Sequence, residues 1–311
     1  MEQIDKLIQS KQSRRRFLAG AGAVGAVGAA TLLTGCNDSS SSSNPTPSPT
    51  PTPTPQDIPD NDILNFALNL EYLEAEFYLR AATGNGLPAS LLLGGDGAVT
   101  GGNMVAGVSP PMASYLNATA QDEMNHVAAL QATIKGNKGT PVPRPVINFT
   151  AAFNALAMAA GIGATFDPFS SPSNFLVGAF IFEDVGVTAY NGAAPAITSN
   201  TILDAAAGIA AVEAYHASII RTLIAGMASA TGADQTALTA ANAVVKLRAT
   251  LGGGNETQLS INSIVAADPN TAVGFSRSTS QVLSIVYANS ATGTASGGFF
   301  PNGLNGSIKT V

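Results

Sequence analysis

The sequence contains few of the side chains from which most binding and catalytic sites are built. It has no tryptophan, one cysteine, two histidines and only 11% charged residues among 311. A single cysteine excludes a disulfide within the chain, and the missing thiolates argue against copper(I) and against an iron–sulfur cluster. The 14 Lys and Arg are outnumbered by 20 Asp and Glu, for a formal net charge of −6. This acidic balance argues against nucleic acid as a partner.

The N-terminal segment has the pattern of an export signal followed by a tether. Consecutive arginines, Arg14–Arg16, precede a Gly/Ala-rich apolar run that resembles a twin-arginine signal. The run ends in Leu-Thr-Gly-Cys, so Cys36 is the predicted lipidation site. We expect residues 1–36 to be the signal peptide and residues 37–57, rich in Ser, Pro and Thr, to be a disordered, extended tether. A membrane-spanning anchor is the alternative, but the run is shorter than the roughly 20 residues that a span requires.

These features predict export to the cell envelope or periplasm, with membrane contact only through the lipid anchor. Twin-arginine export carries folded proteins, which fits a protein that acquires metal before export.

Apolar residues at helical spacing predict an all-α domain over residues 58–228. Its four long helices are expected at 60–82, 110–136, 172–191 and 198–226. Asp60 is the expected N-cap of the first helix. The connection between the second and third helices is proline-rich and then forms a short helix. It is long enough to let those two helices run in parallel.

Residues 229–311 are expected to form a helical extension that packs on the bundle. Helices are predicted near 233–251 and 276–289. The final segment, which contains GFFPNG, has the composition of a loop with exposed aromatic rings. We expect it to cap the bundle or to contact a partner.

Both histidines of the chain lie in the same short motif, Glu-x-x-His. Glu123 precedes His126, and Glu213 precedes His216. On a helix, residues three apart lie on one face, so each motif presents a carboxylate and an imidazole together. Two such helices, with one further Glu from each of two other helices, form dinuclear metal sites in four-helix bundles. The alternative is that each histidine is a core residue bonded to its own Glu.

The two remaining ligands are predicted from glutamates that interrupt apolar helices. Burial of an ionised carboxylate without a partner is very costly, so an inward-facing Glu requires a cation or a proton. Glu71 is the candidate in the first helix, with Glu74 one turn away as the alternative. Glu183 is the candidate in the third helix, with Asp184 as its competitor. Glu71 and Glu183 would then be terminal ligands.

In this scheme Glu123 and Glu213 bridge two ions, and His126 and His216 each supply one nitrogen. Four carboxylates neutralise two divalent ions, and this donor set suits iron or manganese.

The sequence also contains a weak internal repeat. Each terminal Glu is followed seven residues later by a tyrosine, Tyr78 or Tyr190. Seven residues make almost two turns, so each Tyr lies along the same face as its Glu. The repeat indicates a duplicated helical hairpin with two similar half-sites. We interpret both tyrosines as core residues or as hydrogen-bond donors to a ligand carboxylate. Asp122 and Asp184 are interpreted as solvated or as supporting a ligand.

The order Glu, Glu-x-x-His, Glu, Glu-x-x-His resembles the ferritin-like di-iron carboxylate superfamily. The segment Asn69 to Tyr78 is similar to the first helix of ferritins, and the exported chain with its GFFPNG tail resembles bacterial ferritin-like proteins related to plant desiccation-related proteins. The resemblance implies a ferritin-like four-helix bundle with one long crossover. It also implies a cofactor of two iron ions, or of iron and manganese.

The expected function is that of a tethered di-iron oxidoreductase that reacts Fe(II), dioxygen or peroxide in envelope stress protection. The chain lacks the Cys-x-x-Cys pair of the rubredoxin-like electron donor found in rubrerythrins, and its long insertions argue against a sealed storage cage. The alternative function is structural, in a desiccation- or stress-protective protein whose metal site only stabilises the fold.

Overall fold

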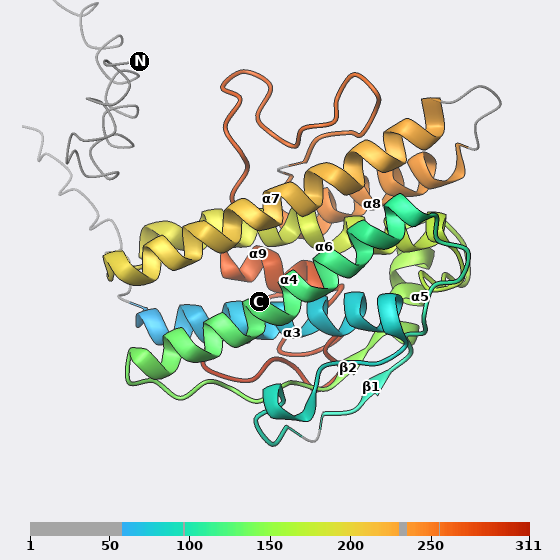
Figure 1. Cartoon of the computed structure of the whole chain (residues 1–311). Coiled ribbons are helices and arrows are strands. Elements are labelled where there is room, and N and C mark those ends of the chain that lie inside the picture. The colour runs from blue at the N-terminus through green and yellow to red at the C-terminus, as the bar shows by residue number, and fades with distance from the viewer. Residues whose placement is uncertain (1–57, 96, 230–234, 255) are drawn as a thin grey trace, which may run out of the picture. The chain divides into compact units, whose positions relative to one another are not determined.

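Two long helical hairpins form the centre of the computed structural model (Figure 1). The structure describes residues 58–95, 97–229, 235–254 and 256–311. The predicted signal peptide, the tether and Cys36 lie outside these residues. The first hairpin pairs α3 (Asp60–Thr83) with α4 (Pro110–Gly136), and the second pairs α6 (Pro172–Ala193) with α7 (Asn200–Ser229).

The four helix ranges agree closely with the predicted ones, because local signals set their ends. Gly84 ends α3 in the left-handed region at φ 79° and returns its N–H to Arg80 O. Pro110 and Pro172 lie in the first turns of α4 and α6, where a missing N–H costs nothing. Ser171 caps α6 by accepting a hydrogen bond from Asn174 N.

The expected role of Asp60 as the N-cap of the first helix is wrong. Asp60 is the first residue within α3, and its carboxylate accepts hydrogen bonds from the backbone N–H groups of Thr198 and Ser199. These bonds outweigh the effect of burial and lower the pKa of Asp60. The carboxylate therefore ties the start of α3 to the start of α7.

The long crossover between the hairpins lets α4 and α6 run in the same direction (Figure 1). It contains strand β2 (Ile147–Asn148) and helix α5 (Phe149–Ala160). β2 pairs in parallel with β1 (Val99–Thr100) from the α3–α4 connection, which also contains the 3-10 turn η1 (Ala89–Leu91). A second 3-10 turn, η2 (Ala194–Ala196), links α6 to α7.

The C-terminal extension forms α8 (Thr236–Gly252), α9 (Thr279–Val286) and a long tail. The expectation of exposed aromatic rings in this tail is wrong, since Phe299 and Phe300 are 1% and 0% exposed. Phe299 enters a cluster of rings around Phe77. The other rings of this cluster are Tyr78, Phe149, Phe153, Phe169, Phe175 and Phe182. The tail is thus part of the core.

A buried ion-pair network joins the extension to the second hairpin. Asp184 Oδ2 accepts hydrogen bonds from Arg221 at 2.7 Å and from Arg248 at 2.8 Å. Glu256 Oε1 bridges Arg248 and Arg277 at 2.9 and 2.8 Å. Asp184 is therefore a buried member of an ion-pair network and not a residue on the solvent-exposed surface.

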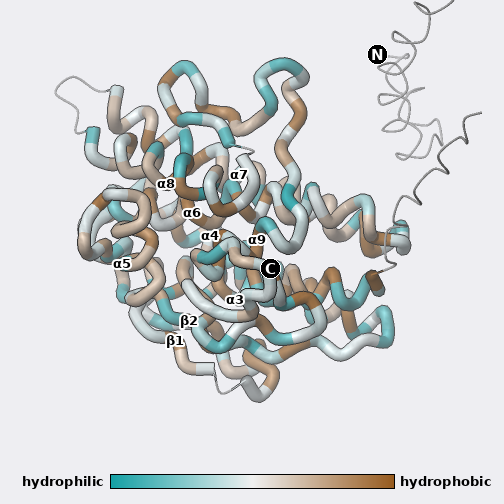
Figure 2. Tube along the Cα trace, turned by 180° about the vertical axis from the view of Figure 1, so that it is seen from behind, coloured by the Kyte–Doolittle hydropathy of each residue, from teal (hydrophilic) through white to brown (hydrophobic). Residues whose placement is uncertain are grey.

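Hydrophobic and hydrophilic segments alternate along the chain (Figure 2). Among the described residues, no helix combines the length and apolarity needed to cross a membrane.

Candidate metal centre

Six side chains from the four long helices converge at the centre of the bundle. Glu71, Glu123, His126 and Glu213 offer ligand atoms within 4.8 Å of one another, and so do Glu123, Glu183, Glu213 and His216. The structure thus brings together all six residues that the sequence pattern selects. Glu123 and Glu213 belong to both groups, which is the placement expected of bridging ligands.

Both imidazoles direct Nδ1 toward the carboxylates. His126 Nδ1 lies 3.2 Å from Glu71 Oε2, 3.5 Å from Glu123 Oε2 and 3.4 Å from Glu213 Oε1. His216 Nδ1 lies 3.0 Å from Glu123 Oε1 and 3.6 Å from Glu183 Oε2. The two rings are 6.3 Å apart between centroids. His126 therefore faces its own Glu123 and carboxylates from two other helices, whereas His216 faces carboxylates from two other helices.

Several buried carboxylate and imidazole atoms at this centre have no hydrogen-bond partner among the described residues. They are both carboxylate oxygens of Glu123 and Glu213, one oxygen each of Glu74 and Glu183, and His216 Nδ1. Buried polar atoms normally have hydrogen-bond partners. This cluster of unpartnered atoms therefore requires cations or protons. A set of carboxylates and imidazoles without thiolates fits iron or manganese. The residues therefore fit a dinuclear metal site.

The pKa values show how strongly these carboxylates require a positive partner. Burial is the main cause that raises the pKa of Glu123 and of Glu213 to about 8, and neighbouring carboxylates add to it. Burial would also raise the pKa of Glu71, but the hydrogen bond and charge of His126 hold it below its ordinary value. Burial opposes protonation of His126, yet three carboxylates raise its pKa well above its usual range.

The three glutamates of α3 have different surroundings. Glu71 belongs to the first ligand group, whereas Glu74, one turn later and 5% exposed, lies beside the centre without joining either group. Burial and the charges of Glu213, Glu123 and other carboxylates raise the pKa of Glu74 well above its ordinary value. Glu76 instead pairs with Arg80 and Arg144 and is structural.

The two tyrosines of the internal repeat bond crosswise between the hairpins. The Tyr78 hydroxyl donates to Glu183 Oε1, and the Tyr190 hydroxyl donates to Glu71 Oε1. Each tyrosine therefore supports the glutamate of the other hairpin and not the glutamate seven residues before it. This exchange relates the two half-sites by an approximate twofold symmetry.

Comparison with known families agrees with this geometry. The family model of the ferritin-like domain matches residues 59–226, which is more than half of the chain. The chain belongs to the ferritin-like domain family. It is 37% identical over 177 residues to the desiccation-related protein PCC13-62 of Craterostigma plantagineum. That match covers 54% of each protein, so the chain spans about half the length of this relative.

A second relative matches over more of the chain. The ferritin-like catalase Nec2 of Nesocodon mauritianus is 27% identical over 275 residues, which are 81% of this chain and 85% of that protein. This match includes more than the ferritin-like domain itself.

The ferritin-like domain also contains site residues that sequence reasoning missed or left open. Asp122, whose side chain is 47% exposed, lies 3.3 Å from His216 Nε2, so it reaches solvent and also supports a candidate ligand. The hydroxyl of Tyr115 lies 3.5 Å from His216 O. Burial and the charge of Glu183 raise the pKa of Tyr115 well above its ordinary value. Its spacing of eight residues from Glu123, two helical turns, is the signal that could have found it.

Gly186 is a third site residue that was not predicted from the sequence. It has no side chain and so leaves room for the Glu213 carboxylate. A side-chain Cβ at this position would collide with Glu213 Oε2 and would approach Glu74 Oε1 to 3.5 Å. The absence of a side chain lets the Glu213 carboxylate lie against α6. Gly186 follows Glu183 by three residues, so it shares the ligand-bearing face of the helix.

Proposed function

We propose that this ferritin-like protein is a dinuclear iron, or iron–manganese, oxidoreductase that disproportionates hydrogen peroxide. The observation that carries the proposal is the set of buried, unpartnered carboxylate oxygens shared by two half-sites. The name of the relative that matches 81% of the chain, a ferritin-like catalase, supports peroxide as the substrate. Two peroxide molecules yield two waters and one dioxygen, so the reaction needs no external reductant. This agrees with the absence of a Cys-x-x-Cys electron-donor module.

In this proposal the side chains hold the metals and position protons. When bound, two redox-active ions supply the electron exchange of the reaction. Glu123 and Glu213, which belong to both ligand groups, would each help to hold both ions. In the tautomer of His216 that carries its proton on Nε2, Asp122 accepts a hydrogen bond from this nitrogen, and the Nδ1 lone pair is left for a metal. Burial and the neighbouring carboxylates raise the pKa of Glu74 well above its ordinary value, which favours Glu74 as the group that holds and delivers a proton at this centre.

The tyrosines orient the two terminal ligands. Each hydroxyl bonds to Oε1 of a terminal glutamate, Glu71 or Glu183, and leaves Oε2 directed toward a histidine. Such support fixes ligand orientation before metal binds.

Metal content and dioxygen release, measured on the same samples, test the proposal. We expect two iron or manganese ions per chain after reconstitution, and dioxygen release at half the rate of peroxide consumption. His126→Ala and His216→Ala should lose metal and activity. Asn125→Ala, an exposed neighbour on the same helix, is the matched control and should retain both. Fewer than one ion per chain in the unmodified protein would overturn the proposal.

The second candidate function is protective and not catalytic. It is favoured by the 37% identity to a protein named as desiccation-related. In that case the metal centre stabilises the bundle, and the histidine variants loosen the fold although the unmodified, metal-loaded protein releases no dioxygen from peroxide.

We further propose that the protein is exported through the twin-arginine pathway and anchored in the cell envelope by a lipid on Cys36. The three consecutive arginines, the apolar run and the Leu-Thr-Gly-Cys sequence support this location. In a bacterial host, replacing Arg14, Arg15 and Arg16 with Lys should block export. Cys36→Ser should permit export but should release the protein from the membrane fraction. Normal export of the Lys variant would contradict the pathway, and membrane retention of the Ser variant would contradict the anchor.

A further inference from the structure

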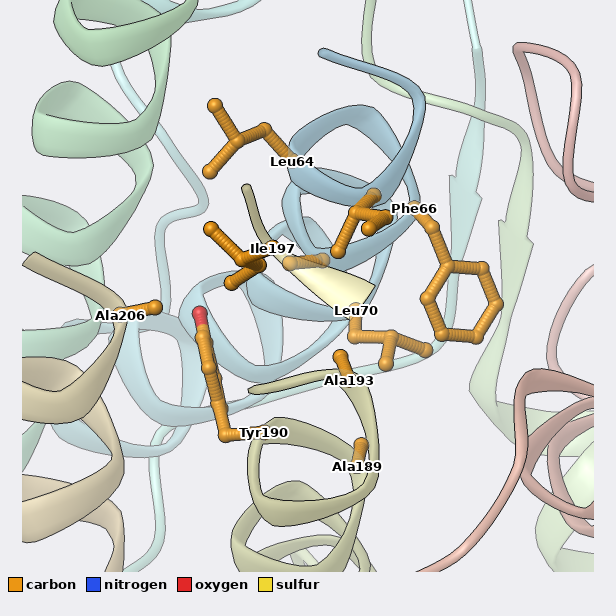
Figure 3. A pocket seen from close by; sticks show the side chains of 10 residues that line it. Leu64, Phe66, Leu70, Ala189, Tyr190, Ala193, Ile197 and Ala206 are labelled. Atoms are coloured by element: carbon orange, nitrogen blue, oxygen red, sulfur yellow. The ribbon is translucent and has the colours of Figure 1, made fainter. Parts of the chain in front are cut away.

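An apolar cavity of about 20 Å³ lies beside the candidate metal centre, between α3, the end of α6 and the start of α7 (Figure 3). Its wall exposes only apolar atoms. The side chains that define it include Leu64, Leu70, Ala193, Ile197, Ala206 and Tyr190. Several of them are alanines, and their small side chains leave the space open.

Tyr190 connects this cavity to the metal centre. Its ring forms part of the cavity wall, and its hydroxyl donates to Glu71 Oε1. A single side chain therefore separates the cavity from a candidate ligand. Because the Tyr190 hydroxyl donates its hydrogen to Glu71, this hydroxyl is not available as a hydrogen-bond donor to a molecule in the cavity.

The size and polarity of the cavity select its occupant. A space of roughly 10–15 Å³ is enough for one water-sized molecule, but a buried water needs two to four polar partners, and apolar cavities stay dry and accept apolar guests. Hydrogen peroxide has two donors and four acceptor lone pairs, so it is disfavoured for the same reason as water. Dioxygen is small, uncharged and needs no hydrogen bond.

The larger cavity near the ion-pair network differs in this respect. It measures about 110 Å³ and is lined by Asp184 and Arg221, so charged groups are available to hold water there. Of these two cavities, the smaller one has the properties of a gas site.

We propose that the apolar cavity beside Tyr190 is a binding site for dioxygen, which takes up the gas released at the metal centre. The role as a product site rests on the proposed peroxide disproportionation, whereas the binding of dioxygen does not.

Paramagnetic relaxation by dissolved dioxygen tests the binding directly. The sample is the full chain with zinc(II) added, because this ion is diamagnetic, and the observed signals are labelled methyl groups under dioxygen pressure. We expect the strongest relaxation at the methyls of Leu64, Ile197 and Ala206. Val127 and Ile134, both 0% exposed in the same bundle and outside the cavity wall, should show less.

Two matched substitutions on α7 test whether the excess methyl relaxation comes from dioxygen in this cavity. Ala206 and Ala217 are each 6% exposed, and only Ala206 lines the apolar cavity, while Ala217 lines the larger one. Ala206→Val should abolish the excess relaxation, and Ala217→Val should leave it unchanged. If Ala206→Val fails to fold, Ala193→Val, at the half-buried end of α6, fills the same cavity.

Equal relaxation at cavity and reference methyls, or excess relaxation that survives filling of the cavity, would overturn the proposal. So would water contacts at these methyls in place of a dioxygen effect. The outcome is separable from the peroxide reaction. Relaxation at the cavity without dioxygen release from peroxide refutes the proposed reaction alone, and release without relaxation refutes the gas site alone.

Discussion

At the scale of single residues, one turn of α3 presents two glutamates of different character to the same centre. Glu71 lies within reach of His126, whereas Glu74 is surrounded by like charges and has one oxygen without a partner. We predict that Glu71→Gln reduces metal binding from two ions per chain to one, because it removes a terminal ligand. Glu74→Gln should keep both ions, since Glu74 belongs to neither ligand group and the amide has the same shape as the carboxyl group it replaces. Metal analysis after gel filtration measures this, and the reverse result would make Glu74 the ligand.

The buried carboxylates also predict how the stability of the metal-free protein depends on pH. Folded Glu123 and Glu213 have pKa values of about 8, against an ordinary 4.5. Between these pH values the folded state binds protons that the unfolded chain has released, so stability falls as pH rises. His126, with a pKa raised above 6.5, acts in the same direction above that pH. Glu71, with a lowered pKa, contributes stability that is lost only below about pH 4.5.

We therefore expect the melting temperature of the metal-free protein to fall from pH 5 to pH 8. Metal should remove or reverse this slope, because ions replace the protons and bind better as pH rises. Calorimetry with and without iron(II) or manganese(II) measures both slopes. A metal-free melting temperature that rises steadily over this range would contradict the prediction.

At the scale of the helix, Gly186 lowers the stability of α6 but leaves the space that the Glu213 carboxylate occupies. Gly186→Ala should stabilise α6 by about 1 kcal/mol through helix propensity. The added methyl group should displace the Glu213 carboxylate, however, and weaken metal binding by about 10–100-fold, as is typical when ligand support is lost. Gly208→Ala on α7 is the matched control, because a Cβ there meets nothing within 4 Å. It should gain stability and keep full metal affinity. Equal metal affinities in the two variants would exclude the spacing role of Gly186.

The helices show what sequence could predict and what it could not. The end of α3 followed from Gly84, and the starts of α4 and α6 followed from Pro110 and Pro172, because these signals act within a few residues. Six candidate ligands followed from helical spacing and from the cost of burying charge. The crosswise bonds of Tyr78 and Tyr190 could not follow, because they depend on how two hairpins pack.

Two other predictions failed because they also depended on tertiary packing. Asp60 is an acceptable N-cap by residue type, yet its hydrogen-bond partners are 138 and 139 residues away at the start of α7. Phe299 lies in a Gly- and Pro-rich segment that has the local composition of an exposed loop. Its burial depends on rings contributed by α5 and α6. Tertiary partners, not local propensity, decide both cases.

At the scale of the whole molecule, the C-terminal extension continues the core of the ferritin-like domain beyond the residues that the family model matches. Phe299 lies 5.1 Å from Phe153 and 4.9 Å from Phe182 between ring centroids. Phe182 is adjacent to the candidate ligand Glu183 on α6. The buried arginines Arg248 and Arg277 add a second connection, since one bonds to Asp184 and the other to Thr188 on the same helix. We therefore expect one cooperative unfolding transition, in which metal release coincides with loss of the tail.

Phe299→Ala tests whether the tail and the metal centre unfold in one transition, because the residue is remote in sequence from every candidate ligand. Removing a fully buried ring should destabilise the protein by about 3–5 kcal/mol. The whole transition should shift together, whether it is followed by helix content, by tyrosine absorbance or by metal release. Asn302→Ala, an exposed residue in the same tail, should leave the midpoint unchanged. If the tail were an independent lobe, Phe299→Ala would lower only a separate transition, and metal release would keep its original midpoint. Coincident shifts would instead show that the metal centre depends on a core completed by the last residues of the chain.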